Sequence, residues 1–252
     1  MPGAPLLNVL SVSPIRSTPF AVKEMLLPST IKRSFVPAAS GPLLYVLPNC
    51  VDIALLSYRK PPTERLTIGW AGGSSHFQDF AAVKSDLKTF LRRNPDVDMH
   101  FIGENYGELV GRPDARYTGW SANLVDYLSK LDFDIGLAPL AYHRFNRSKS
   151  DLKFLEYSAL GIPVVASDFG PYGESVIHGV TGFLVKHPHE WSRYLRDLVN
   201  DDDMRTEMGI NAKTWAATRV IQSNYWRWEA AYREVLGRLP AHSGAGASVA
   251  LS

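Results

Sequence analysis

The chain has 252 residues, with 27 Lys and Arg against 25 Asp and Glu, so its formal charge is 27 − 25 = +2. Hydrophobic residues make up 45% and charged residues 21% of the sequence, which excludes wholesale disorder and a coiled-coil rod. The near-neutral charge argues against a dedicated nucleic-acid binder, which carries a clear basic excess.

Cysteine content and hydropathy indicate the compartment. Cys50 is the only cysteine, so no internal disulfide can form and a reducing compartment is the simpler interpretation. The most apolar stretch, residues 43–56, is interrupted by polar residues and proline, and it falls short of the roughly 18 apolar residues of a spanning helix. No basic segment precedes the apolar residues at the N-terminus, which disfavours a secretory signal. We therefore expect a soluble cytoplasmic protein, although the sequence leaves a membrane contact open.

Prolines interrupt the first 65 residues every few positions. They leave little room for a long helix or a central strand, so only short extended pieces are expected, at residues 6–12 and 43–47. The run Lys60-Pro61-Pro62-Thr63 is typical of a linker. Residues 1–65 are therefore predicted to be a proline-rich N-terminal remnant and linker without a core of their own.

From Leu66 onwards, short apolar runs alternate with segments of helical periodicity. We expect strands at residues 66–71, 97–102, 115–117, 134–138, 162–166 and 181–185. Helices are expected between them at residues 80–93, 123–131 and 152–160, and after them at residues 191–199, 203–218 and 223–236. Continuous apolar strands that alternate with helices predict an α/β domain over residues 66–240, in which helices cover both faces of a parallel sheet. Residues 241–252 are predicted to be a disordered tail.

Ligands of open parallel sheets bind at the carboxyl ends of the strands. The loop after the opening strand is therefore a candidate binding site. It reads Gly72-Gly73-Ser74-Ser75-His76. Small residues let the backbone approach a phosphate, and the start of the next helix favours an anion. A tight turn that needs glycine is an equally simple explanation, and the Gly-x-Gly-x-x-Gly spacing of dinucleotide-binding proteins is absent. His76 would cap the helix, lie exposed or contact a ligand.

The loop before the helix at 152–160 is more informative. Ser150 or Asp151 would cap that helix, and amides at its start, together with Lys149 and Lys153, suit the negative charge of a nucleoside diphosphate. The two oxygens of Glu156 suit the two hydroxyls of a ribose. An ordinary surface pair between Lys153 and Glu156 is the alternative. The apolar neighbours of Glu156 favour the functional interpretation.

Two further loops follow strands. Residues 167–174 contain Gly170 and Gly173, which suggest unusual backbone geometry or simply a turn into a short helix. Residues 117–121 would offer the Trp120 ring to a base, with core packing of Trp120 as the alternative.

Two other patterns favour structural interpretations. Asp132-Phe133-Asp134 has the Asp-x-Asp spacing of metal-dependent nucleotide-sugar enzymes, but it begins a buried strand instead of ending one, so we expect no metal there. Several aromatic residues lie on the last predicted helices, and helix packing explains them more simply than nucleic-acid stacking does. They are Trp215, Tyr225, Trp226, Trp228 and Tyr232.

A family resemblance is carried by the run KSDLKFLEYSALGIPVVAS over residues 149–167, followed by Gly170, Glu174 and Gly182. These residues resemble the retaining glycosyltransferases of family four. The segment Leu47-Pro48-Asn49-Cys50-Val51-Asp52 is similar to the Pro-Asn-Gly-Val-Asp segment that precedes the donor-binding half of those enzymes, with Cys50 in place of glycine. The resemblance runs from about residue 45 to residue 236 and is most specific over residues 149–185.

The resemblance implies the C-terminal, donor-binding half of a GT-B fold, which is a Rossmann-like parallel sheet with a helical C-terminal extension. It implies transfer of a hexose from a UDP- or GDP-linked sugar with retention, without a cofactor and without a metal at the diphosphate. Glu156 matches the glutamate that binds the donor ribose, and Gly72 and Gly73 lie in the loop that approaches the diphosphate. We expect donor contacts from Glu156, Lys149, Lys153, Gly72, Gly73, Ser74, Ser148 and Gly170, and a base contact from Trp120. No catalytic residue is assigned.

Departures from the family pattern bear on activity. Position 148, which carries the first glutamate of the family's pair, is Ser148, and the family's Arg and Lys after the first strand are absent. Lys149 and Lys153 would replace that charge, as in a divergent subgroup with Lys-Ser-Asp-x-Lys.

The segment that precedes the family match is shorter than a whole domain. Only about 45 residues precede it, so the N-terminal acceptor domain, of roughly 150 residues or more, is expected to be missing or vestigial. A partner chain would then supply the acceptor site, and Trp226, Trp228 and Tyr232 would form a patch that the missing domain leaves exposed. A non-catalytic nucleotide-sugar-binding module is the main alternative, and a GT-B-like nucleotide-sugar epimerase is a third.

Overall fold

The structure is a computed structural model that describes residue 45 and residues 47–238. The pieces expected at residues 6–12, most of 43–47, and the tail at 241–252 lie outside the described residues. The strands are β1 (Thr67–Gly72), β2 (Asp98–Gly103), β3 (Arg116–Gly119), β4 (Ile135–Ala138), β5 (Val164–Ser167) and β6 (Gly182–Val185). The helices are α2 (Phe77–Arg93), α3 (Leu124–Ser129), α4 (Arg144–Arg147), α5 (Leu152–Ala159), α6 (Pro171–Ser175), α7 (Glu190–Asn200), α8 (Asp202–Ala217) and α9 (Ile221–Arg238), with short 3-10 helices η1 (Ile53–Ser57) and η2 (Ser74–His76).

The strands form one sheet in the order β3-β2-β1-β4-β5-β6, and every neighbouring pair is parallel. The chain runs outward from β1 to β3, returns to β4 beside β1, and then runs outward in the other direction to β6. The strand order therefore reverses between β1 and β4. In open α/β sheets a ligand binds at this reversal, outside the carboxyl ends of the two strands.

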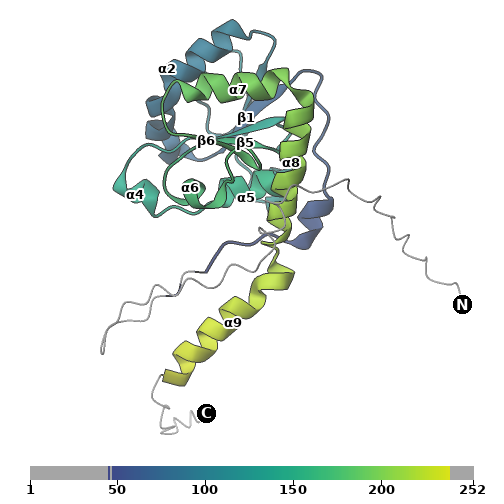
Figure 1. The fold of residues 1–252 in the computed structure, drawn as a ribbon, viewed down its shortest axis with the longest axis vertical. Helices are drawn as coiled ribbons and strands as arrows, with labels where there is room; N and C mark the ends of the chain where they lie inside the picture. The colour runs from purple at the N-terminus through teal and green to yellow at the C-terminus, as the bar shows by residue number, and fades with distance from the viewer. Residues whose placement is uncertain (1–44, 46, 239–252) are drawn as a thin grey trace, which may run out of the picture.

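Helices cover both faces of the sheet, as predicted (Figure 1). On one face, α2 and α7 pack over a cluster that includes Trp70, Phe80 and Phe101. On the other, α3 and α5 pack over a cluster that includes Phe133 and Tyr157. Neighbouring residues of β1 point to opposite faces, and this alternation explains why the strand is buried along its whole length.

A glycine in β1 makes room for the second cluster. A Cβ built on Gly69 would lie 1.8 Å from the ring of Phe133, far inside contact distance. The ring therefore packs directly against the β1 backbone, and any larger residue at this position would push Phe133 out of the core.

The helix boundaries differ from the prediction mainly at α2. This helix begins at Phe77, three residues before the predicted start at Phe80, and η2 precedes it directly. Phe80 is the first fully buried apolar residue, whereas Phe77 is half exposed. Hydrophobic periodicity detects only buried apolar residues, and the first turn contributes the half-exposed Phe77 and the buried but polar Asp79.

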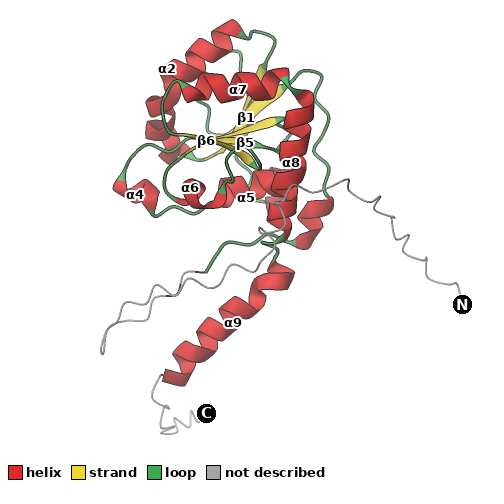
Figure 2. Cartoon of the chain, viewed as in Figure 1, coloured by secondary structure: helices red, strands yellow, loops and turns green. Residues whose placement is uncertain are grey.

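The C-terminal helices leave the α/β body in sequence. Helix α8 packs along α5 and η1, and α9 then extends away from the body (Figure 2). Trp215 packs on Phe154 with ring centroids 4.4 Å apart, as expected. The aromatic residues of α9 are 43–61% exposed, so helix packing does not explain them; they are Tyr225, Trp226, Trp228 and Tyr232. Within residues 45 and 47–238, no helix combines the length and hydropathy that crossing a bilayer requires.

Candidate functional site

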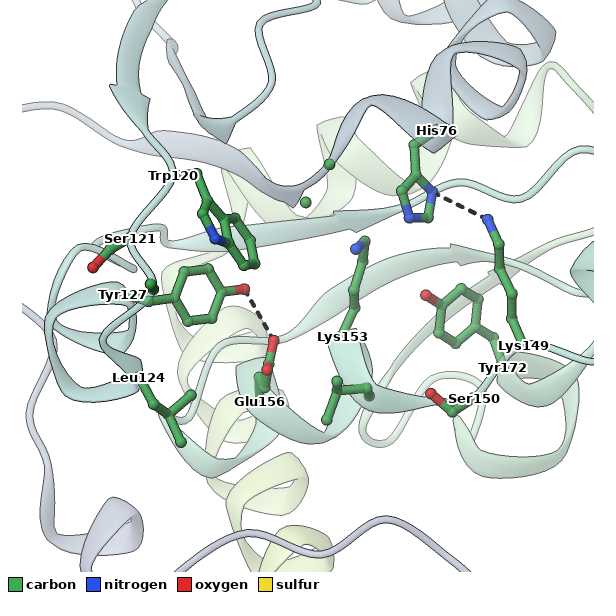
Figure 3. Close-up of a pocket in the computed structure, with 14 residues that line it drawn as sticks. His76, Trp120, Ser121, Leu124, Tyr127, Lys149, Ser150, Lys153, Glu156 and Tyr172 are labelled. Atoms are coloured by element: carbon green, nitrogen blue, oxygen red, sulfur yellow. Dashed lines mark hydrogen bonds between the residues drawn. The ribbon is translucent and has the colours of Figure 1, made fainter.

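A pocket of about 410 Å³ opens at the carboxyl ends of the strands, where their order reverses. Its walls come from the β1–η2 loop, the β3–α3 loop and the chain leading into α5 (Figure 3). Of the residues that the sequence singles out for donor contacts, the pocket brings together Gly72, Gly73, Trp120, Lys149, Lys153 and Glu156.

Glu156 reaches the pocket from the middle of α5. The residue is only 8% exposed, and its Oε2 accepts a hydrogen bond of 3.0 Å from the hydroxyl of Tyr127. Burial raises the pKa of Glu156, while the charge of Lys153 and the Tyr127 hydroxyl oppose that rise. Among the described residues no hydrogen bond to Oε1 is found, so this oxygen is available to a ligand. The alternative of a surface pair with Lys153 is wrong, because the carboxylate is buried.

Lys153 lies one turn before Glu156 and points towards β1. Its Nζ lies 5.1 Å from the centroid of the Trp70 ring, and a Cβ built on Gly72 would come within 2.7 Å of it. Burial lowers the pKa of Lys153 to about 8, although Glu156 raises it somewhat. In the described part of the chain the ammonium has no hydrogen bond or ion pair. A largely desolvated cation therefore faces the pocket beside the glycine loop.

Tyr127 of α3 also lines the pocket, although it was not among the predicted site residues. Its ring is buried, and its hydroxyl holds Glu156. Burial and the neighbouring Glu156 charge raise the pKa of Tyr127 far above its usual value, so it stays a donor. The available signal was chemical, because a buried tyrosine hydroxyl usually needs a partner.

Trp120 stands at the mouth of the pocket. It is 63% exposed, so the alternative of core packing is wrong. Its ring lies 5.5 Å from that of Tyr127. An exposed indole beside a polar pocket is a surface on which a planar base can stack.

A buried carboxylate, Asp79 in the first turn of α2, organises the opposite wall. Its Oδ2 lies 2.7 Å from Nδ1 of His76 and accepts from Nζ of Lys149 at 3.2 Å. Its Oδ1 accepts from the backbone of Ala141 at 2.8 Å and from the side chain of Asn146 at 2.6 Å. Burial alone would raise the pKa of Asp79, but these donors lower it. Asp79 therefore stays ionised and joins three separate segments.

Asp79 was not among the predicted site residues. An acidic residue in a first helical turn is usually explained by the helix dipole, and that explanation hides a buried role. The spacing of His76 and Asp79, three residues apart across the start of a helix, was the available signal. His76 is neither exposed nor a side-chain cap: it is 9% exposed and makes no capping bond.

Three expected contact residues do not line the pocket. Ser74 begins η2, Ser148 ends α4, and Gly170 precedes α6 with a φ of +58°. The expected cap of α5 also differs. Asp151 occupies the N-cap position without a side-chain capping bond, because its carboxylate binds Arg219 at 3.1 and 3.2 Å instead.

The two aspartates of the Asp-x-Asp pattern are engaged elsewhere. Asp132 binds His100 and Arg116, and Asp134 binds Lys60 and the backbone of β1 at its amino end. Across residues 45 and 47–238, His, Cys, Asp and Glu side chains form no group of three that could hold a metal ion.

Residues 152–215 match the family model described as glycosyl transferases group 1. The matched segment contains Lys153 and Glu156, and therefore part of the pocket wall.

Curated relatives match over part of their length. A D-inositol 3-phosphate glycosyltransferase of Paenarthrobacter aurescens is 30% identical over 177 residues, which cover 59% of this chain and 39% of that protein. A GDP-mannose-dependent alpha-(1-6)-phosphatidylinositol monomannoside mannosyltransferase of Mycobacterium tuberculosis is 32% identical over 78 residues, 30% of this chain and 19% of that protein. The chain thus spans about two fifths or less of the length of these relatives.

Solved structures share the fold at low sequence identity. Anabaena Alr3699/HepE, crystallised with UDP-glucose, superposes with a TM-score of 0.59 at 20% identity, covering 76% of this chain and 58% of that one. A glycosyltransferase from Rickettsia africae superposes with a TM-score of 0.56 at 14% identity, covering 76% and 57%. The predicted fold, a Rossmann-like parallel sheet of the GT-B type, is thereby confirmed.

Proposed function

We propose that the protein binds a nucleoside-diphosphate sugar in this pocket and takes part in transferring the sugar to an acceptor with retention at the anomeric carbon. One observation carries the proposal: the buried ammonium of Lys153 faces the pocket beside Gly72 without a partner among the described residues. A desolvated charge that is not neutralised is costly. A diphosphate next to the Gly72-Gly73 backbone would neutralise Lys153 and, with Lys149, stabilise the charge of the leaving group.

The rest of the pocket suits the nucleoside. The carboxylate of Glu156 lines the pocket where a ribose would present its hydroxyls, and Trp120 offers a stacking surface at the rim. The volume of about 410 Å³ lies within the usual range for small-molecule sites. Names of similar proteins support a uridine or guanosine nucleotide, since one was crystallised with UDP-glucose and another is described as GDP-mannose-dependent.

We also propose which segment of the chain binds the donor and where the acceptor site comes from. Residues 66–240 would form the donor-binding domain, residues 1–65 a remnant and linker, and a separate partner chain would supply the acceptor site. Two of the similar glycosyltransferases match over 39% and 19% of their own length. No cofactor or metal is required, because the cations at the diphosphate are lysines.

A ligand screen tests the donor site directly. Thermal unfolding of the full chain with uridine, guanosine, adenosine and cytidine diphosphates, and with the corresponding sugars, should show stabilisation by a uridine or guanosine compound. A ligand at 100 times its dissociation constant adds about 2.7 kcal/mol to the free energy of unfolding. Lys153→Met should abolish that shift. If no nucleotide raises the unfolding temperature, the proposed function is wrong.

A turnover assay separates an enzyme from a binding module. We expect the purified chain to bind the nucleotide sugar but to transfer or hydrolyse it weakly. Robust transfer to a small acceptor by the chain alone would contradict the partner-chain proposal. Tight binding without any released sugar, even with a candidate partner added, would instead favour a non-catalytic nucleotide-sugar-binding module.

A further inference from the structure

His76 and Asp79 form a hydrogen-bonded pair beside the pocket, and His76 lines it. Asp79 is 1% exposed. Four nitrogen atoms lie within hydrogen-bonding distance of its carboxylate: Nδ1 of His76, Nζ of Lys149, the backbone nitrogen of Ala141 and the side-chain nitrogen of Asn146. Because an ionised carboxylate only accepts, the ring of His76 must carry its proton on Nδ1. In the neutral ring, Nε2 is then a bare acceptor.

Nε2 of His76 faces the part of the pocket that Lys149 and Lys153 line. Figure 3 shows Nε2 of His76 turned towards the pocket interior, with Lys153 approaching from α5 and Lys149 on the far side of the ring. Nζ of Lys149 lies 3.4 Å from Nδ1. No described residue hydrogen-bonds Nε2, and of the two nearby ammonium groups only that of Lys149 is paired, with Asp79 at 3.2 Å.

We propose that Asp79 holds His76 and Lys149 as one phosphate-facing unit, in which His76 takes a proton from solvent when a diphosphate enters and donates a hydrogen bond to it from Nε2. The proton returns to solvent when the nucleoside diphosphate leaves. Asp79 is a positioning residue, and His76 is the residue that contacts the diphosphate. This inference rests on the proposed function, since it requires a diphosphate in the same pocket.

The charges around His76 explain why protonation would follow binding. Burial lowers the pKa of His76, and the charges of Lys153 and Lys149 lower it further, against the hydrogen bond to Asp79. A diphosphate would cancel the effect of both lysines and add its own negative charge, so the pKa must rise when it binds.

The other titratable groups near the His76 ring are tyrosines, and they do little to oppose its protonation. Tyr106, which follows β2, donates to the carbonyls of Gly73 and Ser74, and burial raises its pKa to about 12. Tyr172 of α6 lines the same pocket, and burial raises its pKa as well. Both stay neutral at pH 7, so Asp79, Lys149 and Lys153 set the charge that His76 experiences.

Ring-nitrogen NMR of the full chain tests the unit. We expect His76, assigned by its loss in His76→Asn, to be the neutral Nδ1-protonated form at pH 7 in the free protein. Saturation with uridine diphosphate or inorganic pyrophosphate should protonate both nitrogens and raise the apparent pKa by about 1 unit or more. Calorimetry in buffers of different ionisation enthalpy should report proton uptake that His76→Asn removes.

His76→Asn keeps an amide donor towards Asp79, so the fold should be retained, and affinity for pyrophosphate should fall about 10-fold or more. His189→Asn, which removes an exposed histidine, is the matched control and should leave the uptake unchanged. Asp79→Asn should shift the tautomer of His76 and reduce proton uptake. If this variant does not fold, His76→Asn alone decides the question.

The outcomes separate this inference from the proposed function. Uridine diphosphate binding with no change in His76 protonation would overturn the unit and leave the proposed function standing. Pyrophosphate binding with proton uptake, but no gain from the nucleoside, would support the unit and contradict the nucleotide site. An Nε2-protonated ring in the free protein, or no binding of either probe, would overturn the unit.

Discussion

The hydroxyl of Tyr127 on α3 donates to Oε2 of Glu156 on α5 at 3.0 Å, and this bond occupies one carboxylate oxygen while Oε1 has no hydrogen-bond donor among the described residues. Both residues are buried. The pair thus presents one acceptor in a fixed direction, which is what discrimination among the hydroxyls of a pentose requires.

Removal of the tyrosine hydroxyl should affect sugar discrimination. We expect the wild-type protein to bind uridine diphosphate more tightly than its 2′-deoxy analogue, and Tyr127→Phe to reduce that preference by roughly 0.5–1.5 kcal/mol. Calorimetry with both nucleotides measures the difference. Tyr142→Phe, on an exposed residue, is the control and should behave as wild type. An unchanged preference in Tyr127→Phe would show that this hydroxyl does not orient Glu156.

Loss of the Glu156 carboxylate should weaken nucleotide binding directly. Glu156→Ala removes a charged hydrogen-bonding partner, which should cost roughly 1.5–3 kcal/mol of binding free energy. Glu207→Gln on the exposed side of α8 provides a carboxylate control. Equal nucleotide affinities for Glu156→Ala and wild type, measured by calorimetry, would remove Glu156 from the donor site.

Lys153→Met should stabilise the ligand-free protein and weaken its binding of a nucleotide. The change removes a desolvated ammonium but keeps the side-chain length, so the ligand-free protein should gain roughly 1–3 kcal/mol of unfolding free energy. Nucleotide affinity should fall at the same time. Lys84→Met, on the exposed face of α2, should change neither quantity. Urea unfolding that shows a loss of stability in Lys153→Met would mean that the ammonium already has a favourable environment.

The same lysine predicts a pH dependence. Burial lowers the pKa of Lys153 to about 8 in the folded protein, against an ordinary value near 10.4 in the unfolded chain. Between these values the unfolded chain binds more protons, so the Lys153 contribution to stability should rise with pH from about 8 to about 10.4. Nucleotide affinity should fall over the same range as the ammonium loses its charge. Lys153→Arg should bind nucleotide without that decline, and an equal decline in both proteins would point to another group.

Arg219 joins the C-terminal helices to the start of α5. Its guanidinium contacts both oxygens of Asp151 at 3.1 and 3.2 Å and the carbonyl of Asn49 at 3.0 Å. Because the pair is largely buried, Arg219→Ala should cost about 3 kcal/mol of unfolding free energy. Arg233→Ala breaks an exposed pair with Glu229 and should cost less than about 0.5 kcal/mol. Similar losses in both variants, measured by chemical denaturation, would contradict this contrast.

Much of the fold followed from local sequence patterns. Runs of five or six residues rich in apolar side chains predicted five of the six strands within a few residues, because a central parallel strand is buried on both faces. The edge strand β3 is mostly exposed. The helix predicted at residues 152–160 agrees with α5 to within one residue, and Gly161 and Pro163 after it do not continue a helix. The first turn of α2 was missed because its buried residue, Asp79, is polar and its aromatic residue, Phe77, is half exposed.

The pocket residues were found only in part. Glu156, Lys149 and Lys153 are close in sequence and near a helix start, so their spacing already placed them together. Tyr127 and Asp79 lie 29 and 70 residues from the partners that they hold, Glu156 and Lys149. Such contacts depend on how α3 and α2 pack against α5 and its preceding loop, and no local pattern encodes that packing.

The amino-acid sequence by itself determined the alternation of strands and helices, and it identified an acid and two lysines at one strand-end loop. Only the tertiary structure decided which charges remain unpaired in the pocket and which are bound within the protein. The reason is physical: propensity and periodicity act over one turn or one strand, whereas burial and charge pairing depend on distances between segments far apart in the chain.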